Sequence, residues 1–208
     1  ECEKIAIEKL KHFVSKDAFN IEGFGKKIVE NFWNLNLIKL PHHIFNLDFK
    51  KIENLEGWGK QSMENLKYSI NQRKNISLER LIYSLGIRHI GLENAKILSK
   101  YFKSFSNFIN FSNEINSDDI LNIDGIGETQ LQSVKNFFNN KVNLNILKDL
   151  QKILEVKKAV TKQKNGLLNE KTLILAGMTD KSIPLTSTNP FLNSLNAVTD
   201  ITGLLTFI

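Results

Sequence analysis

The stretch Ile21-Glu22-Gly23-Phe24-Gly25 recurs with changes as Leu55-Glu56-Gly57-Trp58-Gly59, as Leu85-Gly86-Ile87-Arg88-His89-Ile90-Gly91 and as Ile123-Asp124-Gly125-Ile126-Gly127. Each copy begins with an apolar residue, contains two glycines and precedes an amphipathic run. The last glycines are residues 25, 59, 91 and 127, so successive copies are spaced by 34, 32 and 36 residues. A regular spacing of this size indicates one supersecondary unit that is used repeatedly.

Apolar residues around these stretches recur every three or four positions, which favours amphipathic helices. Ser77 is placed to cap a helix that begins with Leu78, and Ser117-Asp118-Asp119 is a further helix-start signal. The other predicted helices cover residues 4–15, 26–37, 60–73, 105–116, 128–138 and 145–156. Two helices joined by a tight turn form a helix-hairpin-helix, so the pattern predicts an all-α domain of four tandem helix-hairpin-helix repeats over residues 4–156.

The composition changes after this domain. Residues 157–170 are polar and lysine-rich, which is typical of an exposed linker. Residues 171–177 favour a buried strand that ends in a turn. From residue 182 onward Asp200 is the one charged residue, and no clear periodicity predicts a structure there.

The repeated glycines suggest a chemistry. A glycine accepts positive φ in a turn and leaves no Cβ to keep a ligand away from the main chain. The helix that follows has unpaired N–H groups in its first turn and the positive end of its dipole there. Together these features make a site for an anion such as a phosphate, and a phosphate contact does not depend on base identity.

The candidate DNA-contacting residues are of two kinds: turn glycines that expose main-chain donors, and cations that supply long-range attraction. Taken singly, each cation is better explained as a solvated surface charge, and each glycine as an ordinary turn. A helical scaffold that uses glycine turns only for packing is the competing interpretation. The candidates are Gly23, Gly25, Lys26, Lys27, Gly57, Gly59, Lys60, Gly86, Arg88, Gly91, Gly125 and Gly127.

The four turns differ in their side chains. Glu128 follows the fourth turn and would repel a phosphate, so this turn is ranked electrostatically weakest. Phe24 and Trp58 occupy the middle of their turns, and we interpret them as hydrophobic plugs between the two helices rather than as base-stacking residues.

The overall composition is that of a globular protein. The net charge is +6 and the pI about 9.3, which is compatible with a nucleic-acid partner without requiring one. One cysteine excludes an internal disulfide, and no apolar run is long enough to span a membrane. The chain starts at Glu1 without an initiator methionine or a signal-peptide pattern, and we expect it to be cut from a longer protein.

Residues 10–25 and 77–91 resemble the helix-hairpin-helix domain of bacterial NAD-dependent DNA ligases, and Ile123-Asp124-Gly125-Ile126-Gly127 fits its fourth repeat. The resemblance extends over about residues 1–177. It implies a domain that tracks the minor-groove side and backbones of nicked duplex DNA and helps to close a clamp around it. It also implies DNA replication and repair as the setting, and a cytoplasmic, nucleoid-associated bacterial protein without a membrane partner.

The same resemblance assigns the ends of the chain. Residues 1–3 match the end of a zinc finger, in which Cys2 would be the last of four zinc ligands; zinc binding would need the three upstream cysteines. Residues 171–177 resemble the first strand of a BRCT domain, and the likeness stops after Met178, which predicts a degenerate, poorly folded α/β remnant over residues 171–208.

No Lys-x-Asp-Gly occurs in the chain, so the lysine that accepts AMP is absent and no catalytic residue is assigned. NAD, zinc and magnesium are therefore implied for the full-length family and no cofactor for this chain, which we do not expect to be active alone. The expected partners are double-stranded, preferably nicked, DNA and the missing N-terminal ligase domains.

Two alternatives stay open. A helix-hairpin-helix glycosylase would be an enzyme of another kind, but it would carry one hairpin followed by a catalytic loop and a pocket acid. A ligase piece with no working role, or one that only binds other ligase parts, is the second alternative, and the nearly uncharged tail favours it.

Overall fold

The computed structural model describes residues 2–53, 55–111, 123–159, 172–173 and 183–184. The chain divides into two compact units, Glu1–Val160 and Thr161–Ile208, and every described helix lies in the first. The domain limits drawn from the sequence stay a prediction, since the described residues cover little of the second unit.

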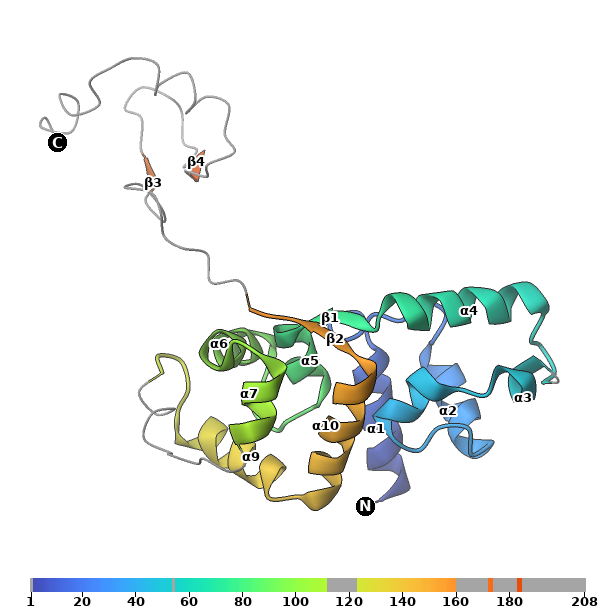
Figure 1. Ribbon diagram of the computed structural model, residues 1–208, viewed down its shortest axis with the longest axis horizontal. Coiled ribbons are helices and arrows are strands. Elements are labelled where there is room, and N and C mark those ends of the chain that lie inside the picture. The colour runs from blue at the N-terminus through green and yellow to red at the C-terminus, as the bar shows by residue number, and fades with distance from the viewer. Residues whose placement is uncertain (1, 54, 112–122, 160–171, 174–182, 185–208) are drawn as a thin grey trace, which may run out of the picture. The chain divides into compact units, whose positions relative to one another are not determined.

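The first unit consists of helical hairpins. Turns connect α1 (Glu3–Val14) to α2 (Lys26–Asn34), α3 (Phe49–Glu53) to α4 (Lys60–Gln72) and α5 (Leu78–Ser84) to α6 (Leu92–Phe102), and the fourth turn leads into α9 (Glu128–Phe138). The first two hairpins lie on one side of the unit and the last two on the other (Figure 1). The other described helices of this unit are η1 (Pro41–Asn46), α7 (Phe105–Asn110) and α10 (Lys141–Ile153). The predicted all-α class is confirmed for these residues.

The helices bury most of the apolar stripe that the sequence predicts, but Ile5 in α1 and Leu35 just after α2 are exposed. In α1 the buried residues are Leu10, Phe13 and Val14, at the i, i+3 and i+4 spacing of one helix face. The turn that follows α1 buries Ile21 and Phe24 in the same core. The turn is therefore held in place by its apolar residues, while its polar residues and glycines remain at the surface.

Aromatic rings fill the core of each side. Phe13 stacks on Phe19 with ring centroids 4.3 Å apart, and Phe45 lies 5.2 Å from Phe19. A second group contacts edge to face with centroids 5.1–5.6 Å apart: Phe102, Phe108, Phe111 and Phe138. Such geometry adds to the burial energy of aromatic pairs. A cluster of packed aromatic rings thus stabilises the core on each side of the unit.

Several predicted helix limits are wrong. The helix predicted over 26–37 ends at Asn34, because Asn36 takes a left-handed φ of 55° and the Leu37 amide bonds back to the Phe32 carbonyl at 2.9 Å. The helix predicted over 105–116 ends at Asn110. The helix predicted to start at residue 145 starts at Lys141, because the Asn140 side chain accepts a hydrogen bond from the Val142 amide at 2.9 Å and caps it.

The sequence also missed a strand pair. β1 (Asn75–Ser77) pairs in parallel with β2 (Glu155–Lys157), in the register Ile76 to Val156. The helix predicted to reach residue 156 therefore ends at Ile153, and β2 takes the first residue of the predicted linker. Ser77 does precede α5, but its side chain makes no capping hydrogen bond.

In the second unit, β3 (Thr172–Leu173) pairs antiparallel with β4 (Ile183–Pro184). β3 falls within the strand predicted over residues 171–177. The remainder of that strand, most of the predicted BRCT-like remnant and the helix-start signal at residues 117–119 lie outside the described residues.

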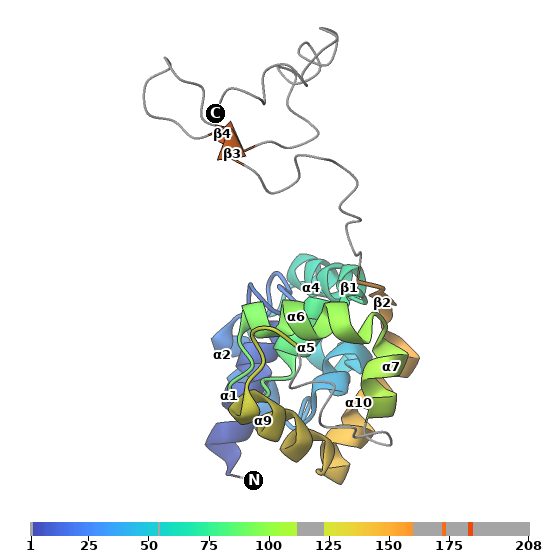
Figure 2. The same cartoon turned by 90° about the vertical axis from the view of Figure 1, so that its left-hand side faces the viewer.

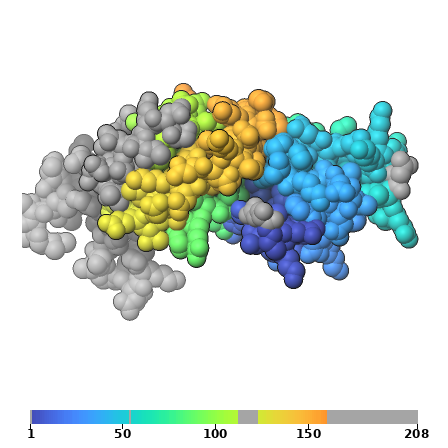
Figure 3. Space-filling model, turned by 90° about the horizontal axis from the view of Figure 1, so that it is seen from below, coloured from blue at the N-terminus to red at the C-terminus, as the bar shows by residue number. Residues whose placement is uncertain are grey.

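Helix α10 closes the first unit. It contacts α7, α9 and η1, and Figure 3 shows α10 in orange between the yellow α9 and the light-blue segment that contains η1. Figure 2 shows α6, α7 and α9 from the side of the second pair of hairpins. The α10–η1 contact thus joins the two pairs of hairpins.

Histidines lie at this contact. His42 Nε2 is 3.9 Å from Asp149 Oδ2, and the His43 ring lies 4.5 Å from the His42 ring, edge to face. His43 Nδ1 accepts a hydrogen bond from the Lys39 amide at 3.2 Å. Burial, and next the charge of His42, lower the pKa of His43, against a smaller opposing effect of Asp149. The folded protein therefore favours neutral His43.

This arrangement predicts acid sensitivity. Because the pKa of His43 is lower in the folded chain than its ordinary value of 6.5, the unfolded chain binds the proton more readily. The stability that neutral His43 provides is complete above pH 6.5 and is lost as the pH falls through the lower, folded-state pKa. We expect the melting temperature to fall by a few degrees over that range in calorimetry. His43→Asn keeps an acceptor for the Lys39 amide without titrating, so an equal fall in this variant would refute the assignment.

Candidate nucleic-acid interface

The four turns share one backbone geometry. In each, the fourth residue donates its N–H to the carbonyl of the first: Phe24 to Ile21 at 3.2 Å, Trp58 to Leu55 at 3.1 Å, Ile90 to Ile87 at 3.0 Å and Ile126 to Ile123 at 3.0 Å. The third residue has a left-handed φ, as a type II turn requires. These third residues are Gly23 (77°), Gly57 (84°), His89 (61°) and Gly125 (89°).

The third turn corrects the sequence interpretation. The two glycines of that copy, Gly86 and Gly91, predict a longer turn, but the turn runs from Ile87 to Gly91 and is as long as the others. His89 takes the left-handed position that glycine holds elsewhere. Gly86 lies at the C-terminal end of α5, with φ 62° and its amide bonded to the Tyr83 carbonyl at 3.1 Å. Gly86 is thus a helix terminator beside the turn.

The last glycine of each turn is the N-cap residue of the next helix. Gly25, Gly59 and Gly91 have φ of −71°, −87° and −81°, in the extended region that any residue adopts. A Cβ built on each of the three would meet nothing within 4 Å. The fold therefore does not require glycine at these positions, whereas a ligand that approaches the main chain would.

The amides at these positions are available. Within the part of the chain that the structure describes, the N–H groups of Gly25, Gly59 and Gly91 have no hydrogen-bond partner, and all three residues are exposed. The amides of the first helical residues add to them, because they have no partner inside the helix. Three turns thus present donors to solvent at the positive end of a helix dipole.

The fourth turn is different. Gly127 donates its N–H to Oε1 of Gln130, three residues later, at 3.2 Å. A Cβ at Gly127 would meet that same oxygen at 3.3 Å. The Gln130 carboxamide thus occupies the donor that a phosphate would use, and the exposed Glu128 carboxylate lies next to it. Both features make the fourth turn the least favourable of the four for an approaching anion.

The predicted cations surround the first three turns. Lys26, Lys27, Lys60 and Arg88 are exposed, and no ion pair is found for any of them among residues 2–53, 55–111 and 123–159. By contrast, Lys11 bonds to Glu8 and Glu30, each at 2.6 Å. The four cations beside these turns therefore have charge that no described carboxylate offsets by an ion pair.

The middle residues of three of the four turns are buried. Phe24 is 2% exposed and its ring lies 5.6 Å from that of Phe32, which confirms Phe24 as a hydrophobic plug. Ile90 and Ile126 fill the same position in their turns. Trp58 is half-buried against Phe32 at 5.4 Å and also lines a groove.

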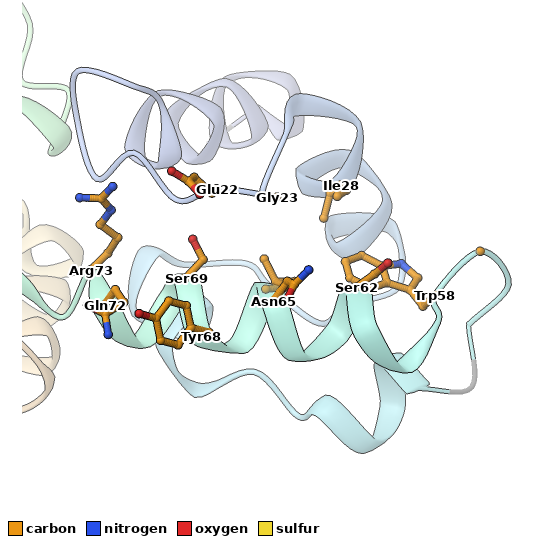
Figure 4. Close-up of a pocket in the computed structure, with 12 residues that line it drawn as sticks. Glu22, Gly23, Ile28, Trp58, Ser62, Asn65, Tyr68, Ser69, Gln72 and Arg73 are labelled. Carbon is orange, nitrogen blue, oxygen red and sulfur yellow. The ribbon is translucent and has the colours of Figure 1, made fainter.

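That groove, of about 920 Å³, lies between the first two turns and includes Gly23 and Gly57. Figure 4 shows α4 opposite the first turn, with Ser62, Asn65 and Ser69 directed toward it. Arg73 closes one end and donates from Nε to the Asn20 carbonyl at 2.9 Å. These α4 residues are not among the candidates that the sequence predicts, although their spacing of three and four residues places them on one helix face.

A second groove, of about 640 Å³, lies between the third turn and α9. It carries cationic and neutral polar groups together with one carboxylate. Its polar lining residues are Arg88, His89, Glu128, Thr129, Gln132, Ser133, Lys135 and Asn136.

A zinc site does not fit the described residues. Cys2 is an exposed free thiol and the one cysteine in the chain. Among the described residues no three His, Cys, Asp or Glu side chains gather as a metal would need. The described helices also include none with the length and apolar character needed to cross a membrane.

Comparison with known proteins agrees with this geometry. Residues 80–147 match the helix-hairpin-helix motif family. The chain is 62% identical over 177 residues to a DNA ligase of Pelagibacter ubique. The matched region is 85% of this chain and 26% of that ligase. DNA ligases of Wolbachia pipientis and Rickettsia bellii are 41% and 39% identical, each over 85% of this chain and over 28% and 27% of their own lengths. The chain thus spans about a quarter of the length of the curated relatives it matches.

Proposed function

We propose that this chain, a relative of bacterial DNA ligases over 85% of its own length, binds duplex DNA through its sugar-phosphate backbone, without reading base sequence. Phosphate contacts of this kind position a duplex and carry no sequence information. The contact set would be the first three turns: main-chain donors at Gly25, Gly59 and Gly91, with the nearby cations Lys26, Lys27, Lys60 and Arg88 for attraction. Gly23, Gly57 and Gly125 would hold the turn backbone in its left-handed form. Gly86, at the end of α5, is left out of this set.

One observation carries the proposal. Gly25, Gly59 and Gly91 lie where backbone conformation and packing would accept any side chain, yet they have none. They are exposed, and their amides have no hydrogen-bond partner among the described residues. A packing role for these glycines leaves this combination unexplained. A phosphate that approaches the main chain explains both the missing side chain and the free donor.

The ligase relatives give this binding a setting. We propose that the preferred duplex is nicked and that the domain serves a NAD-dependent DNA ligase in replication and repair, in association with the nucleoid. NAD, magnesium and zinc would then be bound by other domains of such a ligase, which are also the expected protein partners. The described residues of this chain would hold and orient the duplex.

Fluorescence anisotropy of the purified chain tests the proposal. Labelled nicked duplex, intact duplex and single strand of the same length are titrated at low salt, each in two unrelated base sequences. We expect both duplexes to bind more tightly than the single strand, the nicked one most tightly, with no effect of base sequence. Absence of binding to every duplex would leave a role in contacts with other ligase parts, and preference for one base sequence would contradict backbone recognition.

A further inference from the structure

The two grooves occupy equivalent places in the fold but differ in chemistry. Each lies between one turn and the helix that follows the next turn: the first turn with α4, and the third turn with α9. The α9 groove carries charged and neutral polar side chains and no Phe, Tyr or Trp. The α4 groove has one carboxylate, Glu22, one cation, Arg73, and two aromatic side chains, Trp58 and Tyr68. The hairpin fold therefore does not require aromatic residues at such a groove.

Tyr68 is the residue that most distinguishes the α4 groove. It lies nine residues after the N-cap Gly59, and the residue nine positions after the N-cap Gly127 is Asn136, which lines the α9 groove. Tyr68 is 67% exposed. Among the residues that the structure describes, its side chain has no hydrogen-bond partner and no ring contact. Its ring therefore gains little burial energy from the fold and is free to stack on a planar ligand.

Carboxamides flank Tyr68 on the helix. Asn65 lies three residues before it and Gln72 four residues after it, the spacing that places side chains on one helix face. Gln61 Nε2 donates to Asn65 Oδ1 at 2.9 Å, which leaves Asn65 Nδ2 as a donor. No partner of the Gln72 carboxamide is found in the described part of the chain. A carboxamide has both donors and an acceptor, as the edges of nucleobases do.

The remaining lining of the α4 groove favours a neutral ligand. Its volume of about 920 Å³ lies within the range of about 300–1,000 Å³ that is usual for ligand sites. Glu22 would repel a phosphate there, and Arg73 Nε already donates to the Asn20 carbonyl at 2.9 Å. Figure 4 shows Tyr68 and Gln72 beside Arg73 at one end of the groove. A planar heterocycle with polar edges matches this set of groups.

We propose that the α4 groove binds an unpaired nucleobase, stacked on Tyr68 with its edge against the carboxamides of Asn65 and Gln72. The inference rests on the proposed function and adds an unpaired base to the substrate. The base would come from a strand end displaced at a nick, because Gly23 and Gly57 of the two duplex-binding turns line the same groove. Paired bases stack on one another, whereas an unpaired base can offer its face to an aromatic side chain. Since every base has such a face, we expect no sequence preference.

A nicked duplex with one unpaired nucleotide at the nick tests this site. The matched probe carries an abasic residue at the same place, so both probes have the same backbone and charge and differ only in the base. We expect the full chain to bind the base-containing probe about tenfold more tightly in fluorescence anisotropy, since base–aromatic stacking has an effect of this order. With 2-aminopurine as the unpaired base, its fluorescence should fall when the ring stacks on Tyr68.

Substitutions of Tyr68 separate stacking from other effects. Tyr68→Ala should abolish the preference for the base and keep the affinity for the abasic probe within about twofold. Tyr68→Phe retains the ring and should retain the preference. Tyr101→Ala is the matched control, because Tyr101 is an exposed tyrosine on α6 that lines neither groove, and it should bind as wild type does. Circular dichroism checks that each variant is folded.

Four results would contradict the inference, and only the last concerns the proposed function. Equal affinity for the two probes would refute the base site while backbone binding stands. An equal loss by Tyr68→Ala on both probes would make Tyr68 a contact to the duplex itself. A free single strand bound as tightly as the base-containing probe would contradict a displaced end as the source of the base. Absence of binding to every duplex would refute the proposed function itself.

Discussion

Replacement of both Gly25 and Gly59 by valine is expected to weaken duplex binding about 100-fold, because each valine would block one phosphate from charge-assisted main-chain donors. The fold should survive, since both residues have extended backbone conformations and open space where the new Cβ would lie. Valine is a poor N-cap residue, so we expect about 1 kcal/mol of destabilisation per site. Fluorescence anisotropy gives the affinity, and circular dichroism gives the helix content and melting temperature.

The matched control places the same side chains at the other ends of the same helices. Asn34 ends α2 and Asn71 lies in the last turn of α4, and both are exposed. Asn34→Val with Asn71→Val should leave duplex affinity within about twofold. The hairpin role is refuted if the glycine variant binds as tightly as wild type, or if the control loses as much affinity.

The two glycines of a turn differ in why a side chain would be unfavourable there, and this difference helps to interpret the valine variants. Gly23 and Gly57 have φ of 77° and 84°, so a side chain there strains the backbone whether or not DNA is bound. Gly25 and Gly59 are unstrained, so a side chain there acts through the space it fills. A loss of binding at Gly25 and Gly59 can therefore be assigned to blocked approach.

The sequence predicted the hairpins because their determinants are local. A turn that needs positive φ selects glycine, and a helix that packs on one side selects apolar residues every three or four positions. The helix predicted over 128–138 matches α9 at both ends for these reasons. The plug role of Phe24 follows from the same logic, because an apolar residue between two glycines has the core as its favourable environment.

The missed features depend on contacts between distant residues. Each strand of the β1–β2 pair has three residues, and paired residues are 80 positions apart in the sequence. Neither strand has the alternating run that identifies a strand. Glycine is the residue expected at a left-handed turn position, so the sequence pattern indicates Gly86 and gives no sign of His89. The Gln130 contact could have been found, since a polar side chain three residues after an N-cap is the spacing of a capping box.

The grooves also combine local features that the sequence predicts with tertiary contacts that it does not. The glycine turns predicted where main-chain donors lie, but the residues that complete each groove come from other helices. Ser62, Asn65 and Ser69 lie opposite the first turn because α4 packs there, and Ser133 reaches His89 across 44 positions of sequence. The local sequence pattern therefore locates the glycine turn of each groove, and tertiary packing determines which residues of other helices line it.

The affinity for duplex should also fall steeply with salt. If four to six phosphates are neutralised, the logarithm of the binding constant should fall with the logarithm of salt concentration with a slope of about −4 to −5. Affinity would then drop about 10² to 10³-fold between 50 and 200 mM salt. The physical cause is the release of counterions condensed on the DNA, which proceeds only where cations replace them.

The unpaired lysines make this prediction specific. Lys26→Gln with Lys27→Gln removes two exposed cations beside the first turn, and the slope should become shallower by roughly 2. Lys100→Gln with Lys148→Gln makes the same change in net charge, at exposed positions of α6 and α10 outside the turns. Since counterion release depends on local contact, this control should keep the wild-type slope. Equal changes in both variants would mean that net charge alone attracts the DNA, and a wild-type slope near zero would mean that no phosphates are neutralised.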